Sequence, residues 1–286
     1  MANIDKIIQK SDAVFTTAES EFDKKVKASE QLIFDEILIL VQELNIQAGR
    51  IKNDADAQKL LLSLENKIRA AFEKSGYNKA VYDLLSNFDT IAKNKITLHD
   101  VLNGKRITND QINPIKRLAV QSTIDNLLGA GISKDLIYPI RQEIYRQALV
   151  GGTIKDAEAG IRKYILNNKG NDSTLLRYAS QVATDSMNQF AGTIESSIKD
   201  EFGFNAYRYV GSIILDSRCQ CRWWVKQEKI SEEQLSVEIP IALNGGRLDK
   251  SGDCLCSGMI PGTNTSNFGI YRGGYRCRHK AIATNL

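Results

Sequence analysis

The residues best suited to chemistry are clustered near one end of the chain. All five cysteines and one of the two histidines lie between residues 219 and 279 of 286. Thiolates and imidazoles are ligands that Zn²⁺ prefers, and on a strand or turn residues i and i+2 can present two of them to one ion. The sequence therefore predicts a metal site with zinc as the candidate cofactor. Its candidate ligands form three pairs with one residue between the members: Cys219 and Cys221, Cys254 and Cys256, Cys277 and His279.

The same residues leave alternatives open. Six candidates exceed the ligand set of one tetrahedral zinc ion, so one pair together with Cys277 and His279 is sufficient. The residues also fit two disulfides with one free thiol, if the protein meets an oxidising medium, or five reduced thiols. The first ten residues show no export signal, which favours synthesis in a reducing cytoplasm, where clustered cysteines more often bind metal or stay reduced.

Basic residues are enriched at the same end of the chain. Arginine guanidinium groups beside tyrosine rings are well suited to contact a phosphate backbone, so the basic residues at this end are candidates for nucleic-acid binding. The net charge of +4 is too small to argue for nucleic acid by itself, and a solvated tail is the simpler interpretation. The residues concerned are Arg272, Arg276, Arg278 and Lys280.

Signatures of common enzymes are missing from the sequence. There is no G-x-S-x-G, H-E-x-x-H, Walker or G-x-G-x-x-G motif, so we expect no enzymatic activity. Of Trp223 and Trp224, adjacent in the chain, we expect one in the core and one at the surface. We expect His99, which lies in a polar stretch, to be a surface residue.

Helical patterns fill the chain up to about residue 203. Apolar residues recur there at three- to four-residue steps, and Gly76 and Thr153 fit helix caps. Residues 1–17 suggest a short helix or a loose tail, and residues 92–110 a loop. We expect helices over residues 20–48, 54–74, 77–91, 113–128, 133–150, 153–165 and 172–199.

The pattern changes after Gly203. Residues 205–215 are rich in Tyr, Val and Ile and predict a strand, and residues 240–275 are rich in Gly, Asn and Ser. The predicted fold class is α+β, with a long N-terminal helical bundle followed by a small, loop-rich, β-containing C-terminal domain that a zinc ion could hold together. The predicted divisions are a helical region 1–130, a second helical part 131–203, and a small cysteine-rich domain 204–286.

Several short motifs follow one another in the second half of the chain. They are Thr184-Asp185-Ser186 with Phe190 on a helix, Gly203, a strand over 207–210, Asp216 with Arg218 and Cys219, Lys229-Ile230, and the closing Gly-Gly-Tyr-Arg-Cys-Arg-His of 273–279. In order and spacing they resemble the Mu F-like head morphogenesis family of phage minor head proteins, over about residues 133–286. The chain departs from the family at Ala191 and Gln227-Glu228, and its pair Cys254 and Cys256 has no counterpart.

The resemblance implies a structural component of a virion. Such a protein is made in the host bacterial cytoplasm, joins the procapsid in few copies and lies in the capsid interior near the portal. Its implied partners are the portal protein, the major capsid protein and packaged DNA, which the basic end would face. No membrane partner is implied, and no apolar run reaches the roughly 18 residues of a membrane span. A zinc-dependent nucleic-acid-binding protein outside any virion is the alternative, and a toxin-like transferase is a third.

Overall fold

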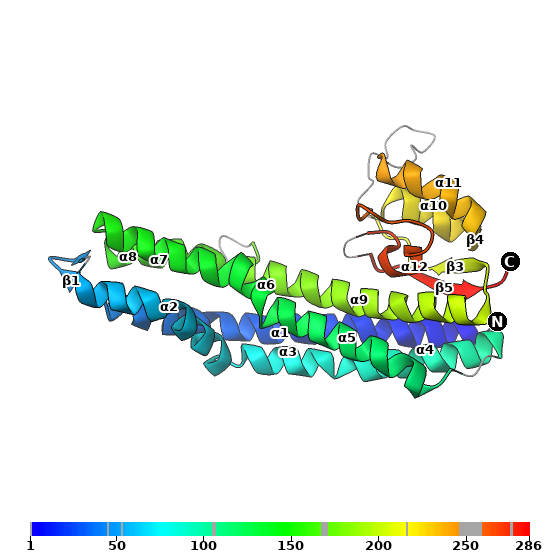
Figure 1. Ribbon diagram of the computed structural model, residues 1–286, viewed down its shortest axis with the longest axis horizontal. Helices are drawn as coiled ribbons and strands as arrows, with labels where there is room; N and C mark the ends of the chain where they lie inside the picture. Colours follow the sequence, from blue (N-terminus) through cyan, green and yellow to red (C-terminus); the bar gives the residue numbers. More distant parts are fainter. Residues whose placement is uncertain are drawn as a thin grey trace. The chain divides into compact units, whose positions relative to one another are not determined.

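The computed structural model shows a mostly helical chain with small antiparallel sheets (Figure 1). It describes residues 2–44, 46–52, 54–104, 107–166, 171–215, 217–245, 259–274 and 277–286, without the side chains of residues 2–5. The chain groups into two compact units, each built from segments that are distant in sequence. One unit comprises residues 1–14, 88–120 and 184–286, and the other comprises residues 15–87 and 121–183.

Helices dominate the described part of the chain. The predicted α+β class, helical first and β-containing at the C-terminal end, is confirmed. The helices are α1 (Ala2–Gln42), α2 (Ala55–Lys74), α3 (Tyr77–Leu85), α4 (Asn87–Asn103), α5 (Asn109–Leu127), α6 (Ala130–Ile132), the π-helix η1 (Ser133–Ile137), α7 (Tyr138–Val150), α8 (Ile154–Ile165), α9 (Thr174–Phe202), α10 (Cys219–Gln227), α11 (Glu232–Leu243) and α12 (Phe268–Tyr271).

Helix ends with capping residues lie close to their predicted positions. The Thr153 side chain accepts a hydrogen bond from the Asp156 backbone N–H, and the Asp156 carboxylate accepts one from the Thr153 N–H. This reciprocal pair satisfies two backbone donors at the start of α8. At the end of α2, Gly76 takes a left-handed φ of 86°, which glycine adopts without steric strain.

Two predictions about helices are wrong. Residues 1–17 form neither a short helix nor a tail, because α1 continues as one helix of 41 residues to Gln42. Most of the stretch predicted as a loop, residues 92–110, is α4 up to Asn103. Its inward face carries Lys95 and His99, which a hydropathy pattern counts as polar, and their burial hides the helical periodicity.

The unit formed by residues 15–87 and 121–183 is a helical assembly with one small hairpin. Strands β1 (Ile46–Gln47) and β2 (Arg50–Ile51) pair antiparallel. Helix α7 packs on α8 and also contacts α2 (Figure 1). Its core contains buried aliphatic side chains from each of these helices, so burial of their apolar stripes holds this unit together. They include Val26, Ile37, Leu64, Ile68, Ile144 and Ile161.

The other unit contains the C-terminal sheet. Strand β3 (Ala206–Val210) lies in the middle, with β4 (Lys229–Ser231) and β5 (Lys280–Thr284) antiparallel on either side (Figure 1). Tyr207 stands opposite Ile230 on β4 and Ala283 on β5. All five residues of β5 are buried. Residues 280–284 are thus part of a core, whereas Asn285 and Leu286 after them are exposed.

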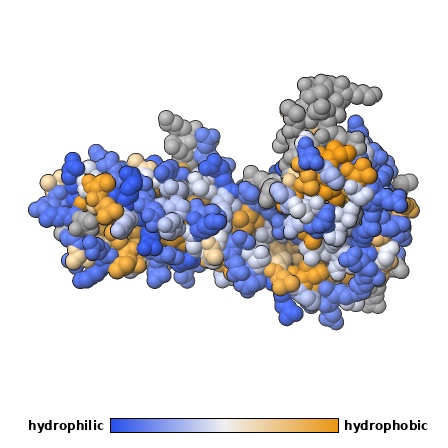
Figure 2. Space-filling view, turned by 45° about the horizontal axis from the view of Figure 1, so that its top comes forward, coloured by the Kyte–Doolittle hydropathy of each residue, from blue (hydrophilic) through white to orange (hydrophobic). Residues whose placement is uncertain are grey.

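Apolar side chains also reach the surface. The face in Figure 2 is mostly hydrophilic, and hydrophobic residues emerge on it in patches. Exposed large apolar side chains include Leu62, Leu118 and Leu215. Scattered exposed residues of this kind are normal for folded proteins. Within the described ranges, no helix combines the length and the apolar character needed to cross a bilayer.

Candidate metal centre

Helix α10 supplies the first donor of the site. Arg218 at its N-cap is extended, and the helix begins at Cys219, so Cys221 lies in the first turn. Backbone N–H groups at a helix N-terminus favour negative charge nearby, which suits a thiolate. The Arg218 guanidinium donates to the Gly273 carbonyl at 2.8 Å and so joins this helix start to the loop that carries the other donors.

The segment before β5 supplies the other two donors. The Cys277 N–H donates to the Gly274 carbonyl at 3.1 Å. From there the chain runs extended into β5, where residues two apart face the same side. Cys277 and His279 therefore point together, as their spacing predicted, and Arg278 between them is exposed.

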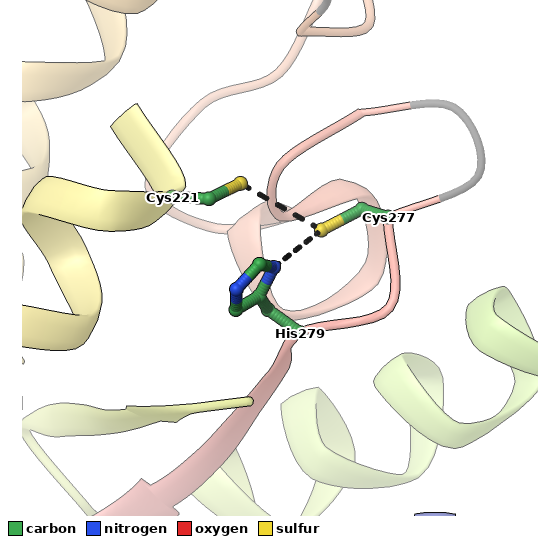
Figure 3. A group of neighbouring side chains, drawn as sticks. All are labelled: Cys221, Cys277 and His279. Carbon is green, nitrogen blue, oxygen red and sulfur yellow. Dashed lines mark hydrogen bonds between the residues drawn. The ribbon is translucent and has the colours of Figure 1, made fainter. Parts of the chain in front are cut away.

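Cys221, Cys277 and His279 form a buried group that could hold a metal ion. Figure 3 shows the three side chains converging from α10 and from the segment that enters β5. The two sulfur atoms are 3.9 Å apart, and Cys277 Sγ is 3.8 Å from His279 Nδ1. A tetrahedral zinc ion with Zn–S of about 2.3 Å and Zn–N of about 2.0–2.1 Å has S···S edges of about 3.8 Å and S···N edges of about 3.6 Å. These two distances are close to the edges that such an ion requires, and all three donor atoms lie within 4.8 Å of one another.

Gly273 covers the sulfur atoms. A Cβ atom built on this residue would lie 2.4 Å from Cys221 Sγ and 2.5 Å from Cys277 Sγ. Contacts this short are not tolerated, so only glycine lets the loop backbone approach the site so closely. The hydroxyl of Tyr209 also faces the sulfurs, at 3.4 Å from Cys221 Sγ and 3.5 Å from Cys277 Sγ.

The two thiols differ in how readily they ionise. The hydrogen bond with Cys221 holds the pKa of the Cys277 thiol well below its usual range against the effect of burial, with help from His279 and Arg272. The same hydrogen bond, together with burial, raises the pKa of the Cys221 thiol. Two buried thiols at this distance favour one negative charge over two. A divalent cation would remove that restriction, because metal binding deprotonates thiol ligands.

The remaining candidate ligands are not in this group. Cys219 is disulfide-bonded, whereas Cys221 and Cys277 are free thiols. A pair on a strand or turn could present both thiols to one ion, but Cys219 and Cys221 both lie on α10. Residues two apart on a helix point about 200° apart, so only one of the pair can face a given ion. Cys254 and Cys256 lie outside the described residues.

The basic residues singled out for nucleic-acid binding have varied surroundings. Arg272 is buried and donates to the Asn188 carbonyl at 2.8 Å. Lys280 is buried and forms an ion pair with Asp12, and burial lowers its pKa to about 8. Arg278 is exposed, and Arg276 lies outside the described residues. Nucleic-acid binding by these residues stays a prediction, with Arg278 the accessible member among those described.

Sequence reasoning missed a second buried cluster. The prediction that His99 is a surface residue is wrong, since it is fully buried on α4. His99 Nε2 lies 2.9 Å from Glu195 Oε2, and Lys95 Nζ lies 2.5 Å from Glu195 Oε1. Burial alone would raise the pKa of Glu195, but Lys95 and His99 lower it to about 2. The spacing of Lys95 and His99, four residues apart on one helix face, was the only available sequence signal.

The tryptophan prediction fits the observed burial. Trp224 is fully buried and Trp223 is half-buried. The Trp224 ring contacts Phe268 edge-on, with centroids 5.0 Å apart. This packing fixes α10 against α12 and so helps to position Cys221.

Comparison of the chain with protein families, curated proteins and solved structures finds no match.

Proposed function

We propose that the chain is a structural, non-enzymatic minor head protein of a phage, associated with the portal inside the capsid. The proposal is supported by the Mu F-like order of motifs along the sequence and by where the described motifs lie. The strand over 207–210 pairs with Lys229-Ile230 in one three-stranded sheet, and the closing motif leads directly into the third strand, β5. Motifs from three stretches distant in sequence thus lie on this sheet or lead directly into it, which is expected if they belong to a single domain.

Within this protein, we infer that zinc is held by Cys221, Cys277 and His279. The spacing of the donor atoms is the observation that carries this inference. Two sulfurs and one imidazole nitrogen form a soft donor set, which favours zinc over magnesium or calcium. A water molecule or a further protein group would complete the tetrahedron. Zinc with two thiolates and a neutral imidazole carries no net charge, which suits a buried site.

The role of the ion would be structural. Cys221 starts α10, whereas Cys277 and His279 precede the final strand, so one ion would join elements 56 residues apart in sequence. The loop before β5 contains few apolar residues, so a metal link would add stability that apolar burial does not supply there. A stable C-terminal sheet would then present a fixed surface to the portal and capsid proteins.

The burial of two basic residues favours this proposal over a free nucleic-acid-binding protein. Arg272 and Lys280 have partners within the protein and are not accessible to a phosphate backbone. Among the four basic residues, Arg278 is the exposed one in the part of the chain that the structure describes, and contact with packaged DNA at this end would use it. Four phosphate contacts would already give only a modest, salt-sensitive affinity, and fewer give less.

The test uses particles of the phage that encodes the chain. Particles are purified through a density gradient, and peptides of this chain are quantified against those of the major capsid protein by mass spectrometry. We expect the chain to follow the particles at a constant, low ratio and to be cross-linked to the portal protein. Absence from particles, with binding of the purified protein to DNA in solution, would instead establish the alternative.

A further inference from the structure

The ring of Tyr209 is fixed beside the metal site from several sides. Its side chain is 1% exposed, on the central strand β3. The ring lies against Trp224 and Phe268, with centroids 5.3 and 6.1 Å away, and is nearly parallel to the His279 ring at 5.5 Å. With neighbours of this size, the hydroxyl has little freedom to point elsewhere than at the two sulfurs.

The distances between the hydroxyl and the sulfurs suit a hydrogen bond to sulfur. Tyr209 Oη is 3.4 Å from Cys221 Sγ and 3.5 Å from Cys277 Sγ. In metal sites, groups outside the ligand set that donate hydrogen bonds to the ligands orient them and tune their charge. A phenol O–H aimed between two thiolates is such a donor, because it withdraws negative charge from sulfur without adding any.

We propose that Tyr209 is a positioning residue of the metal site, donating its hydroxyl hydrogen to the thiolates of Cys221 and Cys277 and thereby strengthening binding of a thiolate-seeking divalent cation. This inference rests on the proposed zinc site and names a group that controls it. Direct ligation by Tyr209 is the less favourable arrangement, since a phenolate would leave a buried site with net negative charge.

Tyr207 provides a matched control. It is a buried tyrosine on the same strand and face, and its ring also contacts Phe268, with centroids 5.7 Å apart. Its hydroxyl, however, approaches Gly269 and not the sulfurs. Removing either hydroxyl therefore deletes the same atom from the same strand, but only one deletion removes a donor to the metal site.

The experiment compares the full-length parent, Tyr209→Phe and Tyr207→Phe. Zinc affinity is measured by competition with a chromophoric chelator, and Co²⁺ is substituted to record the thiolate-to-metal charge-transfer band and the d–d bands. For Tyr209→Phe we expect about 10–100-fold weaker zinc binding. Its charge-transfer band should lie at lower energy, because thiolates without the hydrogen bond give up electron density more easily. The d–d bands should remain tetrahedral, and Tyr207→Phe should match the parent in all three respects.

Each other outcome overturns the proposal in a recognisable way. A Tyr209→Phe protein with the parent's affinity and charge-transfer energy would show that the hydroxyl does not act on the thiolates, while the zinc site itself stands. Altered d–d bands would show that Tyr209 is a ligand and not a donor. If the parent binds neither Zn²⁺ nor Co²⁺, the zinc site fails and the role of Tyr209 fails with it.

Discussion

Two buried polar clusters contact strand β5, and they differ in whether protein groups complete them. Near the end of the strand, Glu195 accepts hydrogen bonds from the Ala283 N–H at 2.8 Å, from His99 and from Lys95. Asn103 completes that network by donating to His99 Nδ1 and, at 3.4 Å, to the Ala283 carbonyl. At the start of the strand, the cluster of Cys221, Cys277 and His279 holds two thiols that share a hydrogen bond.

The second cluster is left incomplete by the described groups around it. His279 Nε2 is buried and has no hydrogen-bond partner among them, and the paired thiols resist carrying two negative charges. A divalent cation bound to the two sulfurs and to His279 Nδ1 would let both thiols ionise, although it would not supply a partner for Nε2. The comparison teaches that burial and polarity alone do not identify a ligand site. The Glu195 cluster is satisfied by protein groups, whereas the cysteine and histidine cluster could hold a metal ion, as we propose.

The largest effect should come from breaking the complete cluster. Glu195→Gln leaves the Lys95 ammonium buried without its counter-charge, and removing one partner of a buried ion pair costs about 3–5 kcal/mol. The free energy of unfolding in urea, measured for both proteins, checks this. Asp200→Asn, at an exposed position of the same helix, should change it by less than about 0.5 kcal/mol. If the two variants unfold alike, the cluster does not hold β5 in place.

Acid should weaken the same cluster. The pKa of Glu195 is about 2 in the folded protein and ordinarily 4.5, so the unfolded chain binds more protons between these values. The stabilisation by Glu195 is then fully present above pH 4.5 and is lost as the pH falls toward 2. The difference in unfolding free energy between the parent and Glu195→Gln should shrink to under about 1 kcal/mol by pH 2. A difference that does not change with pH would contradict the assignment of charge in this cluster.

Zinc should stabilise the protein only through the incomplete cluster. At a free zinc concentration of a hundred times the Kd, binding adds about 2.7 kcal/mol to the free energy of unfolding. Cys277→Ser should lose this increment, because it removes a ligand. Thermal unfolding with zinc and with a chelator measures the increment for each protein. Cys219→Ser, which alters a cysteine outside the group, should retain it, and equal increments in both variants would be incompatible with the proposed ligands.

Adding a methyl group to the loop that covers the sulfurs should weaken zinc binding less than removing the ligand Cys277 does. In Gly273→Ala the new Cβ would lie 2.4 and 2.5 Å from the two sulfurs unless the loop moves. Overpacking of this kind lowers the free energy of unfolding by about 1–3 kcal/mol, and displacement of the loop should weaken zinc binding. Zinc titration by calorimetry, with circular dichroism to confirm the fold, checks this. Zinc affinity equal to that of the parent would mean that Gly273 does not cover the occupied site.

The smallest expected change in the free energy of unfolding comes from replacing Lys280, the first residue of β5, which lies between the two clusters. Burial lowers its pKa to about 8, so below pH 8 the folded protein keeps a poorly solvated charge. Because its ion-pair partner Asp12 is 43% exposed and stays hydrated when left alone, Lys280→Met should stabilise the protein by about 1 kcal/mol at pH 6 by removing this penalty. The advantage should disappear as the pH rises from 8 to about 10.5, where the lysine becomes neutral in both states. A constant advantage across this range would show that Lys280 does not titrate as assigned.

Some elements could be predicted because their signals are local. Helix α8 carries its cap at Thr153 and a regular apolar stripe through Ile161, and its observed bounds match the prediction. Strand β3 was recognised from its aromatic and β-branched residues. The pairing of Cys277 with His279 also depended only on local spacing, because the segment is extended.

Other features depend on partners far away in sequence. The polar face of α4 is buried because Glu195, about a hundred residues later, neutralises Lys95 and binds His99. No feature of the sequence near residue 95 indicates that Glu195 is its partner. Likewise, the residues around Cys219 and Cys221 did not reveal that a helix separates their side chains, so the three-residue group could not be chosen from six candidates.

Metal content tests the central claim most directly. Full-length parent, Cys277→Ser and Cys219→Ser are purified under reducing conditions, dialysed without chelator, and analysed for zinc per chain by elemental mass spectrometry. We predict one zinc ion per chain in the parent and in Cys219→Ser, and none in Cys277→Ser. Absence of zinc from the freshly reduced parent, or its retention by Cys277→Ser, would contradict a metal centre at Cys221, Cys277 and His279.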